Sequence, residues 1–262
     1  MRSIEKTEAI VLRSMKYLES SKIVTLYTFE HGKMSAIAKG ARQRKSRFGA
    51  TLEPMSYCSA VIYRNDGRNL QILGECDLLH SFHKIGEDLD CMAAGLAIIE
   101  LTNLVTHEEE KNPALFRLLL NTLRYLDSKP VTTSLVLCHY ELHLASVLGF
   151  HPSFDDCAGC GKDIEEHGQT ATGVRIQMES GVCLYGECAR KSSVGYQLSG
   201  TAFQLLRTLL HSPDPAALEQ VAVDSKTENE IRNFLWAYIQ YHIPGIKTLK
   251  SQKIFSALLQ PT

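Results

Sequence analysis

The spacing of hydrophobic residues changes near residue 80, and this change constrains the fold more than any other feature of the chain. Before it, short runs rich in Val, Ile, Thr and Tyr are separated by polar turns, a pattern typical of β-strands. After it, apolar residues recur at i, i+3, i+4 and i+7, which is typical of amphipathic helices. The sequence therefore predicts an α+β multidomain protein, with a β domain at residues 1–80 and a helical domain at residues 81–262.

The β domain is expected to contain five short antiparallel strands, and this number of strands indicates a small barrel. We expect these strands at residues 8–13, 22–29, 33–38, 57–63 and 69–73. Two tight turns join consecutive strands, at His31-Gly32 and at Asn65-Asp66-Gly67, where glycine would supply the positive φ that a hairpin needs. The pattern predicts a five-stranded OB-fold barrel, whose exposed face and loops commonly bind single-stranded nucleic acid.

The helical domain is expected to be a bundle with well-marked helix ends. Its helices are expected at residues 89–100, 114–127, 133–148, 199–211, 228–242 and 246–259. Asn112 would cap the second helix, and Gly149 would close the third. Thr227 and Glu230 have the spacing of a capping box, which predicts where the fifth helix begins.

Two pairs of cysteines lie in a Gly-rich stretch, residues 151–195, where the helical spacing is lost. A C-x2-C pair, Cys157 and Cys160, is separated by 22 residues from a C-x4-C pair, Cys183 and Cys188. This spacing is close to that of a zinc ribbon, and four thiolates around one ion would contribute about 10 to 16 kcal/mol to the folding of such a segment. We expect one structural Zn²⁺ in a zinc-finger-like insertion. Two disulfides are the alternative, which a reducing compartment disfavours.

The remaining cysteines and histidines give weaker signals. His151 and His167 flank the cysteine pairs, and either would be able to replace one ligand. The other four cysteines lie in apolar contexts and are expected to be buried thiols: Cys58, Cys76, Cys91 and Cys138.

No catalytic motif stands out, so we expect a protein that is not an enzyme. Phosphate-binding loops, the G-x-G-x-x-G fingerprint and the G-x-S-x-G elbow are all missing from the sequence. His139 and His143 have the i, i+4 spacing of zinc hydrolases, but Glu141 would point away from such a metal. Ordinary positions in a helical bundle are favoured for these histidines, with a metal hydrolase as the alternative.

Charge is segregated along the chain, although the net charge is only −1. Residues 1–80 carry a net charge of +5 and the remainder carries −6. Six Lys or Arg and no acidic residue occur between residues 33 and 47. By itself such a run indicates a solvated loop as readily as a binding surface.

The sequence also predicts where the protein resides. Its longest unbroken apolar run, residues 91–99, is half of the roughly 18 residues that a membrane-spanning helix needs. Charged residues at the N-terminus replace the apolar stretch of a secretory signal. We therefore expect a cytoplasmic protein without membrane contact.

Several stretches together resemble the bacterial recombination mediator family RecO. The resemblance rests on residues 7–13, 22–33, 38–42, 45–47, 52–54, 69–73 and 249–251 and on the cysteine segment. It implies an N-terminal OB fold, a helical domain and a zinc-finger-like element in a nucleoid-associated protein. Such a protein would bind single- and double-stranded DNA, anneal complementary strands and help to load the recombinase. Implied partners are RecR, possibly RecF, and the acidic C-terminal tail of single-strand-binding protein. Members with a zinc site commonly carry C-x2-C in both halves, whereas this chain has C-x4-C in the second.

The resemblance gives the basic residues a function. The residues expected to neutralise DNA phosphates are Lys33, Lys39, Arg42, Arg44, Lys45 and Arg47. Stacking on bases would fall to Tyr27, Phe29, Phe48 or Tyr63, any of which would serve equally well in the barrel core. A possible second basic site consists of Lys247, Lys250 and Lys253, which share one face of the last predicted helix. The alternative function is a protein-binding scaffold with structural zinc and no direct role at DNA.

Overall fold

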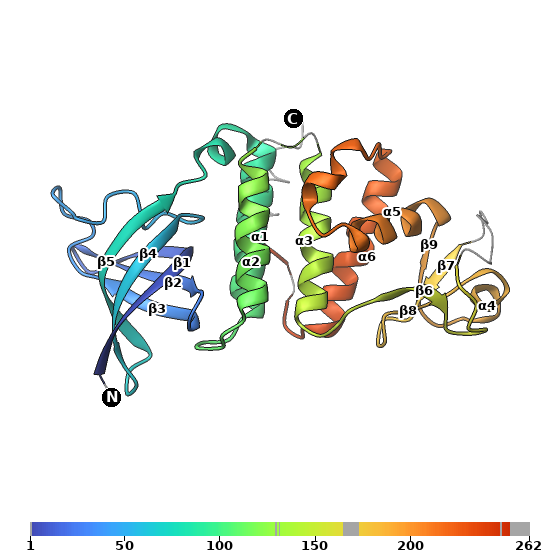
Figure 1. The fold of residues 1–262 in the computed structure, drawn as a ribbon, viewed down its shortest axis with the longest axis horizontal. Helices are drawn as coiled ribbons and strands as arrows, with labels where there is room; N and C mark the ends of the chain where they lie inside the picture. The colour runs from blue at the N-terminus through green and yellow to red at the C-terminus, as the bar shows by residue number, and fades with distance from the viewer. Residues whose placement is uncertain (1, 129, 131, 165–172, 247, 252–262) are drawn as a thin grey trace. The chain divides into compact units, whose positions relative to one another are not determined.

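The computed structural model describes residues 2–128, 130, 132–164, 173–246 and 248–251. It divides into two compact units, one made of residues 1–129 with 248–262 and the other of residues 130–247. We call them the barrel unit and the bundle unit, and Figure 1 labels their helices and strands.

The barrel unit begins with five strands that close into a barrel in the order β1-β2-β3-β5-β4. The strands are β1 (Arg2–Tyr17), β2 (Ser21–Thr28), β3 (Gly32–Ala38), β4 (Tyr57–Asn65) and β5 (Leu70–His80). The prediction of five strands is confirmed, but two details differ. β1 is much longer than expected because it pairs with β2 and β4 along different parts of its length. β3 and β5 pair in parallel. These two strands are not neighbours in sequence, and their pairing is needed to close the barrel.

The two expected glycine turns form for different reasons. Gly32 has a φ of +70°, and a Cβ there would lie 2.0 Å from the carbonyl oxygen of Glu110, so only glycine fits. At the β4–β5 turn, Gly67 does not need a positive φ. Instead, the amide of Gly67 donates to Oδ1 of Asn65 at 3.1 Å, which makes this an Asx turn.

Helices α1 (Leu89–Val105) and α2 (Pro113–Leu126) complete the barrel unit, after a short 3-10 helix (His83–Glu87). Asn112 caps α2 as predicted, because its Oδ1 accepts from the amide of Leu115 at 3.0 Å. From α2, the buried ring of Phe116 contacts the rings of Tyr27, Phe29 and Tyr57. The barrel and α2 therefore share one hydrophobic core.

The bundle unit combines three longer helices with a small sheet. The helices are α3 (Thr133–Val147), α5 (Gly200–His211) and α6 (Ser225–His242), with a 3-10 helix at Pro215–Gln220. The strands of the sheet are β6 (Ser153–Cys157), β7 (Val174–Ile176), β8 (Val182–Leu184) and β9 (Tyr196–Leu198), in the order β6-β8-β7-β9. A short helix, α4 (Gly186–Lys191), lies between β8 and β9 in the chain. Gly149 ends α3 with a φ of +92°, as predicted.

The expected capping box at α6 is wrong. Asp224 caps this helix, since its Oδ1 accepts from the amides of Lys226 and Thr227 at 3.0 Å. Glu230 acts elsewhere: its Oε2 accepts from Oγ of Ser199 at 2.6 Å, at the start of α5. Glu230 therefore bonds to Ser199 at the start of another helix and does not cap its own helix. The last predicted helix, residues 246–259, lies largely outside the described residues.

Candidate metal centre and nucleic-acid interface

Three of the four predicted metal ligands lie together in the bundle unit. The sulfur atoms of Cys157, Cys160 and Cys188 are all within 4.8 Å of one another. Cys157 ends β6, Cys160 follows in the next turn, and Cys188 lies in α4. This is the single group of potential metal ligands found among the residues that the structure describes.

The backbone around these sulfurs fits a metal site. The amide of Gly161 donates to the carbonyl of Cys157 at 2.7 Å, and Gly161 adopts a φ of +70°, so the chain turns tightly between the two cysteines. A Cβ at Gly159 would lie 2.9 Å from both Cβ and Sγ of Cys188, and glycine is needed for this close approach. The three residues are therefore brought together by the fold and not by sequence spacing alone.

Hydrogen bonds favour a thiolate at Cys157. Burial by itself would raise the pKa of this thiol, but the amides of Tyr185, Gly159 and Cys160 point at its sulfur and lower the pKa overall. By contrast, the pKa of Cys188 is raised to about 11 by desolvation and by its neighbour Cys157. Three crowded thiols do not ionise together without a cation, and thiolates are the ligands that Zn²⁺ prefers. The residues fit a bound metal.

Cys183 does not join this group, so the expected four-cysteine shell is not what the described residues form. The residue lies in β8 with a fully buried side chain in the hydrophobic core of the bundle unit. Burial raises the pKa of Cys183 to about 12, which keeps the thiol protonated. The strand requires this side chain in the core, and the C-x4-C spacing did not reveal that.

The other predicted thiols and His151 have ordinary environments. The four remaining cysteines are buried as expected: Cys58, Cys76, Cys91 and Cys138. His151 is exposed, with Nδ1 2.9 Å from Oγ of Ser146, and His167 lies outside the described residues.

The rings of His139 and His143 lie close together in the bundle, tilted by 40°, and Nε2 of each ring contacts a backbone carbonyl. Their ring centroids are 4.1 Å apart. Nε2 of His139 lies 2.8 Å from the carbonyl of Ser212, and Nε2 of His143 lies 3.2 Å from that of Leu209. Burial and the neighbouring His143 lower the pKa of His139 to about 4, so it stays neutral. Backbone carbonyls contact Nε2 of both rings, while Nδ1 of His139 is buried without a hydrogen-bond partner among the described residues, so the two histidines do not converge on a metal position.

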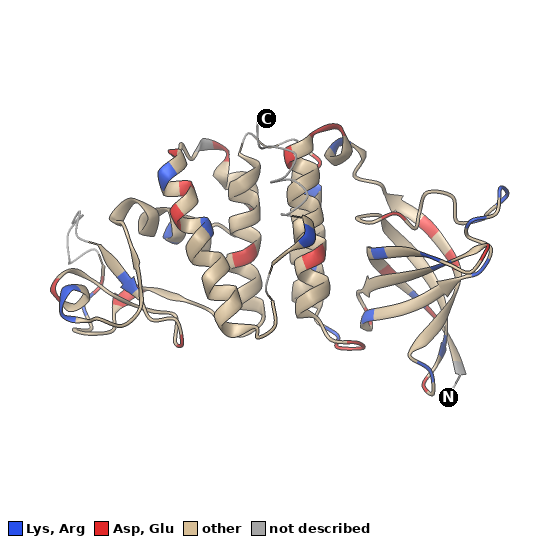
Figure 2. Ribbon diagram, turned by 180° about the vertical axis from the view of Figure 1, so that it is seen from behind, with Lys and Arg blue, Asp and Glu red and all other residues tan. Residues whose placement is uncertain are grey.

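The basic run is mostly exposed on the barrel unit. Figure 2 shows basic residues along the connection between β3 and β4. Exposed members of the predicted set are Lys39, Arg42, Arg44, Lys45 and Arg47. Two of them are anchored: Nη1 of Arg42 donates to the carbonyl of Leu18 at 3.1 Å, and the guanidinium of Arg47 lies 5.2 Å from the ring centre of Phe48. The loop thus presents five cations on a folded support.

Lys33 differs from the rest of this set, because its ammonium group is used inside the protein. Nζ donates to the carbonyl of Asn103 at 2.9 Å and to that of Thr106, both at the end of α1. Burial lowers the pKa of Lys33, partly opposed by Glu108. The ammonium group of Lys33 lies at the C-terminal end of α1, where a positive charge interacts favourably with the helix dipole.

The four aromatic side chains considered for stacking differ in exposure. Tyr27 and Phe48 are buried, and Phe29 packs against Phe116, whereas Tyr63 is 47% exposed. The ring of Tyr63 lies over Gly74, where a Cβ would come within 2.3 Å of it. It lines a cavity of about 500 Å³ with Arg64 and Arg68 among other residues. Gly74 lies in β5 but just beyond the strand expected at residues 69–73, so the sequence prediction did not reveal this close approach.

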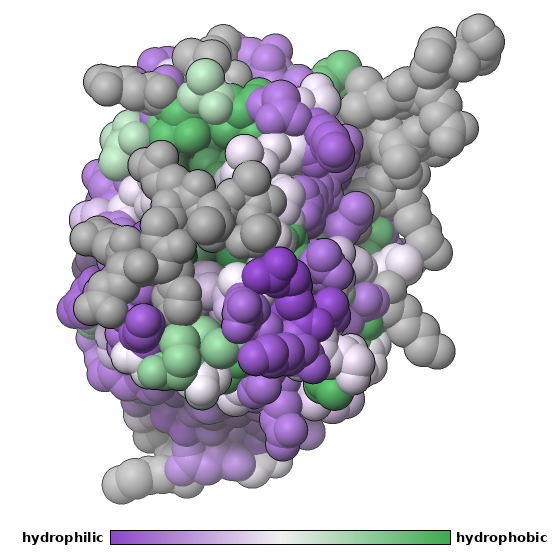
Figure 3. All heavy atoms as spheres, turned by 90° about the vertical axis from the view of Figure 1, so that its right-hand side faces the viewer, coloured by the Kyte–Doolittle hydropathy of each residue, from purple (hydrophilic) through white to green (hydrophobic). Residues whose placement is uncertain are grey.

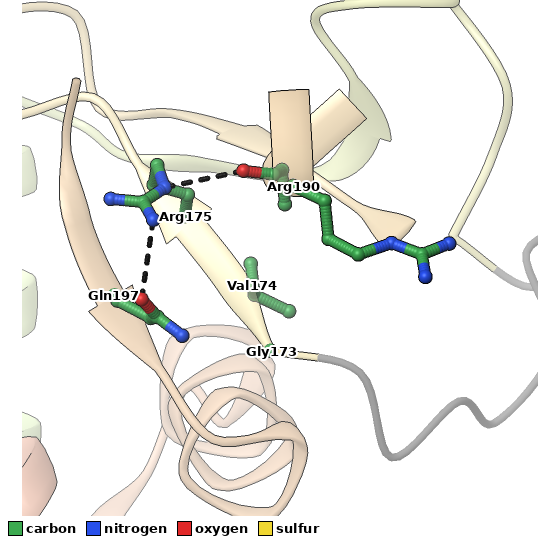
Figure 4. A pocket seen from close by; sticks show the side chains of 6 residues that line it. Gly173, Val174, Arg175, Arg190 and Gln197 are labelled. Atoms are coloured by element: carbon green, nitrogen blue, oxygen red, sulfur yellow. Dashed lines mark hydrogen bonds between the residues drawn. The ribbon is translucent and has the colours of Figure 1, made fainter. Parts of the chain in front are cut away.

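A second, smaller cavity of about 230 Å³ lies between β7, β9 and α4 and is shown in Figure 4. Its most prominent cation, Arg175, is already bonded: Nε to the carbonyl of Ala189 at 3.3 Å and Nη2 to Oε1 of Gln197 at 3.2 Å. Arg190 extends away from this pair in the same view. The guanidinium of Arg175 therefore connects α4 to the sheet.

The possible second basic site is only partly visible. Lys250 is exposed, and its amide and that of Ser251 donate to the carboxylate of Glu100 at 2.8 and 2.9 Å. Lys247 and Lys253 lie outside the described residues. In the part of the chain that the structure describes, no helix is both long and apolar enough to cross a membrane.

Comparison with known proteins agrees with this architecture. The family model described as Recombination protein O N terminal matches residues 1–82, and the one described as Recombination protein O C terminal matches residues 86–253. The DNA repair protein RecO of Bacillus pumilus is 36% identical over 97% of this chain and 94% of its own. That of Chlorobium limicola is 32% identical over 92% and 93%, and that of Salinibacter ruber is 44% identical over 59% of each chain. With both family models matched and full-length relatives above 30% identity, the chain belongs to the RecO family.

Proposed function

We propose that this protein acts in DNA repair by recombination, as a mediator that binds single- and double-stranded DNA. The observation that carries the proposal is the exposed basic loop on the barrel unit, in a chain that belongs to the RecO family. Lys39, Arg42, Arg44, Lys45 and Arg47 neutralise phosphates. The barrel is of the OB type, and its strand order, with β1 between β2 and β4 and β5 between β3 and β4, supports that assignment.

Tyr63 offers a stacking platform at a second place on the barrel unit, near the turn between β4 and β5. Its ring is exposed and supported from below by Gly74, while Arg64 and Arg68 line the same cavity. Arg64 is held by Glu109 at 2.9 Å, so Arg68 is the better phosphate ligand of the two. A base stacked on a tyrosine contributes about 1 to 3 kcal/mol regardless of its identity. Such a platform suits a protein that handles single strands of any sequence.

Annealing follows from this surface without bond chemistry. Two complementary strands repel each other through their phosphates, and a basic surface lowers that repulsion while leaving the bases free to pair. The protein therefore anneals strands without ATP hydrolysis. It also helps to load the recombinase onto DNA coated with single-strand-binding protein, together with RecR, possibly RecF, and the acidic tail of the coating protein. Lys250 is a candidate contact for that tail.

The functional domains of this proposal are an OB-fold DNA-binding domain at residues 1–80 and a helical domain at residues 81–262, with the zinc-finger-like insertion at residues 151–195. One Zn²⁺ is held by Cys157, Cys160 and Cys188. When bound, it stabilises the turn after β6 against α4, in a small sheet of three- to five-residue strands. It has a structural role and takes no part in annealing.

The test is fluorescence anisotropy of labelled single- and double-stranded oligonucleotides with the full chain. In about 0.1 M salt each phosphate contact contributes roughly 0.7 log units, so replacing Arg42, Arg44, Lys45 and Arg47 by Ala should weaken binding by 100-fold or more. The control removes the same charge elsewhere, at four exposed positions: Lys84, Arg190, Lys191 and Lys226. Equal loss in both variants would show non-specific attraction. Unchanged binding by the loop variant would favour the protein-binding scaffold.

Annealing is tested separately, by mixing complementary strands with and without ATP. We expect the same rate in both, and a slower rate for the loop variant. Annealing that requires ATP would refute the proposed mechanism.

A further inference from the structure

Among the residues that the structure describes, the proposed metal centre has one ligand too few for a closed zinc site. Three sulfurs come together, whereas a structural zinc is bound by four protein ligands. Among the described residues, no fourth Cys, His, Asp or Glu offers an atom within the same 4.8 Å group. Cys183, the fourth cysteine of the segment, has a fully buried side chain in the hydrophobic core of the bundle unit.

Tyr185 stands where a second C-x2-C pair would place another cysteine ligand. It precedes Cys188 by the same interval that separates Cys157 from Cys160, so it holds the position of the first cysteine in a second C-x2-C pair. Its backbone amide points at the sulfur of Cys157. Its side chain, however, is buried, and its hydroxyl donates to the carbonyl of Phe154 at 2.7 Å.

Two of the three cysteines reach solvent, whereas Cys157 is buried. Cys160 is exposed, Cys188 is partly exposed, and Gly159 and Gly161 beside them are exposed. Figure 3 faces the side of the molecule that carries β7 and α4, where hydrophilic side chains cover much of the visible surface. A small molecule can therefore approach a metal held by these residues.

We propose that the metal in this protein is held by three thiolates and keeps its fourth coordination position for an exchangeable ligand from solvent. That ligand is water, and a small thiol can replace it as a thiolate. The proposal rests on the metal site proposed above and specifies its coordination. It predicts a centre that exchanges its ligand, and releases its metal to chelators, more readily than a closed four-thiolate site would.

Cobalt substitution tests the coordination directly, because the visible absorption of Co²⁺ reports its ligand set. The full chain is loaded with one equivalent of Co²⁺ under anaerobic conditions, with a phosphine reductant that supplies no thiol. Titration with 2-mercaptoethanol should shift the visible bands and saturate at one thiol per chain. Cys183→Ala should bind cobalt and respond to thiol as the wild type does.

Three results overturn the open position. The first is a wild-type spectrum that thiol does not change, which indicates four protein ligands. The second is a thiol response that appears only in Cys183→Ala, which makes Cys183 the fourth ligand. The third is a response that appears only in His167→Ala, which makes His167 the fourth ligand. Should Cys183→Ala fail to fold, the wild-type titration decides alone. A chain that takes up no cobalt or zinc would instead refute the metal site itself, and leave the DNA-binding proposal standing.

Discussion

Replacing Lys33 by methionine separates two roles for this side chain. If Lys33 holds the end of α1, as its two contacts with the carbonyls of Asn103 and Thr106 indicate, its loss destabilises the barrel unit and leaves DNA binding unchanged. If it binds a phosphate, the effects are reversed. Methionine keeps most of the aliphatic stem, so packing changes little and the ammonium group is the variable under test.

The expected loss of stability follows from these contacts. A hydrogen bond from a charged donor contributes about 1.5 to 3 kcal/mol, and the removal of this donor leaves two carbonyls in a half-buried position. The cost of desolvating the ammonium group, which also lowers the pKa of Lys33, offsets part of this. We expect a net loss of about 1 to 3 kcal/mol in the free energy of unfolding. With a urea m-value of about 2 kcal/mol/M, the midpoint of the barrel unit moves down by about 1 M.

The DNA side of the experiment is a salt titration of binding to a single-stranded oligonucleotide. Each phosphate contact adds about −0.7 to the slope of log K against log salt, which is roughly a 2.6-fold change in affinity between 50 and 200 mM. Five exposed cations give a slope near −3.5, and six give about −4.2. We expect Lys33→Met to keep the wild-type slope.

Lys39→Met is the matched control, because Lys39 is exposed on the same loop system. It should keep the urea midpoint and lose about 0.7 from the slope. The reasoning is refuted if Lys33→Met unfolds at the wild-type midpoint and shows the reduced slope instead.

Three further outcomes are expected. Tyr63→Ala should weaken single-strand binding by about 1 to 3 kcal/mol without changing the salt slope, measured by anisotropy, and Tyr63→Phe should bind normally, whereas a loss in both variants would exclude stacking. Burial raises the pKa of Glu141 to about 8, so the bundle unit should lose stability as the pH rises from about 4.5 through 8. Glu141→Gln should flatten the resulting decline in melting temperature. A wild-type melting temperature that does not change over this pH range would contradict the assignment. Removing zinc with a chelator should expose the segment around β6 and α4 to proteases while the barrel unit still binds DNA, and simultaneous loss of both would show that the metal supports more than its own segment.

Local patterns predicted the elements of this fold well. Alternating residues located all five strands, and Asn112 and Gly149 marked helix ends correctly, because such caps depend on neighbouring backbone groups. Features that depend on distant residues were missed. The parallel contact of β3 with β5 needs barrel closure, and Glu230 bonds to Ser199 instead of capping its own helix.

The same distinction applies to the candidate sites. Sequence spacing found Cys157, Cys160 and Cys188, and charge found the exposed loop. Spacing does not show on which face of a strand a cysteine lies, so Cys183 was included with the ligands. Charge does not distinguish a cation that meets solvent from one that meets a helix end, so Lys33 was included with the DNA-binding residues.

The contact between Phe116 and the barrel aromatics decides how this protein can be divided for experiments. A fragment ending at residue 80 would expose Tyr27, Phe29 and Tyr57, whose rings are covered by Phe116 of α2. It would also lose the carbonyls that receive Lys33 and the loop whose Glu110 lies against Gly32. An isolated DNA-binding fragment should therefore extend through α2, to residue 128, so that the barrel keeps the helices that complete its core.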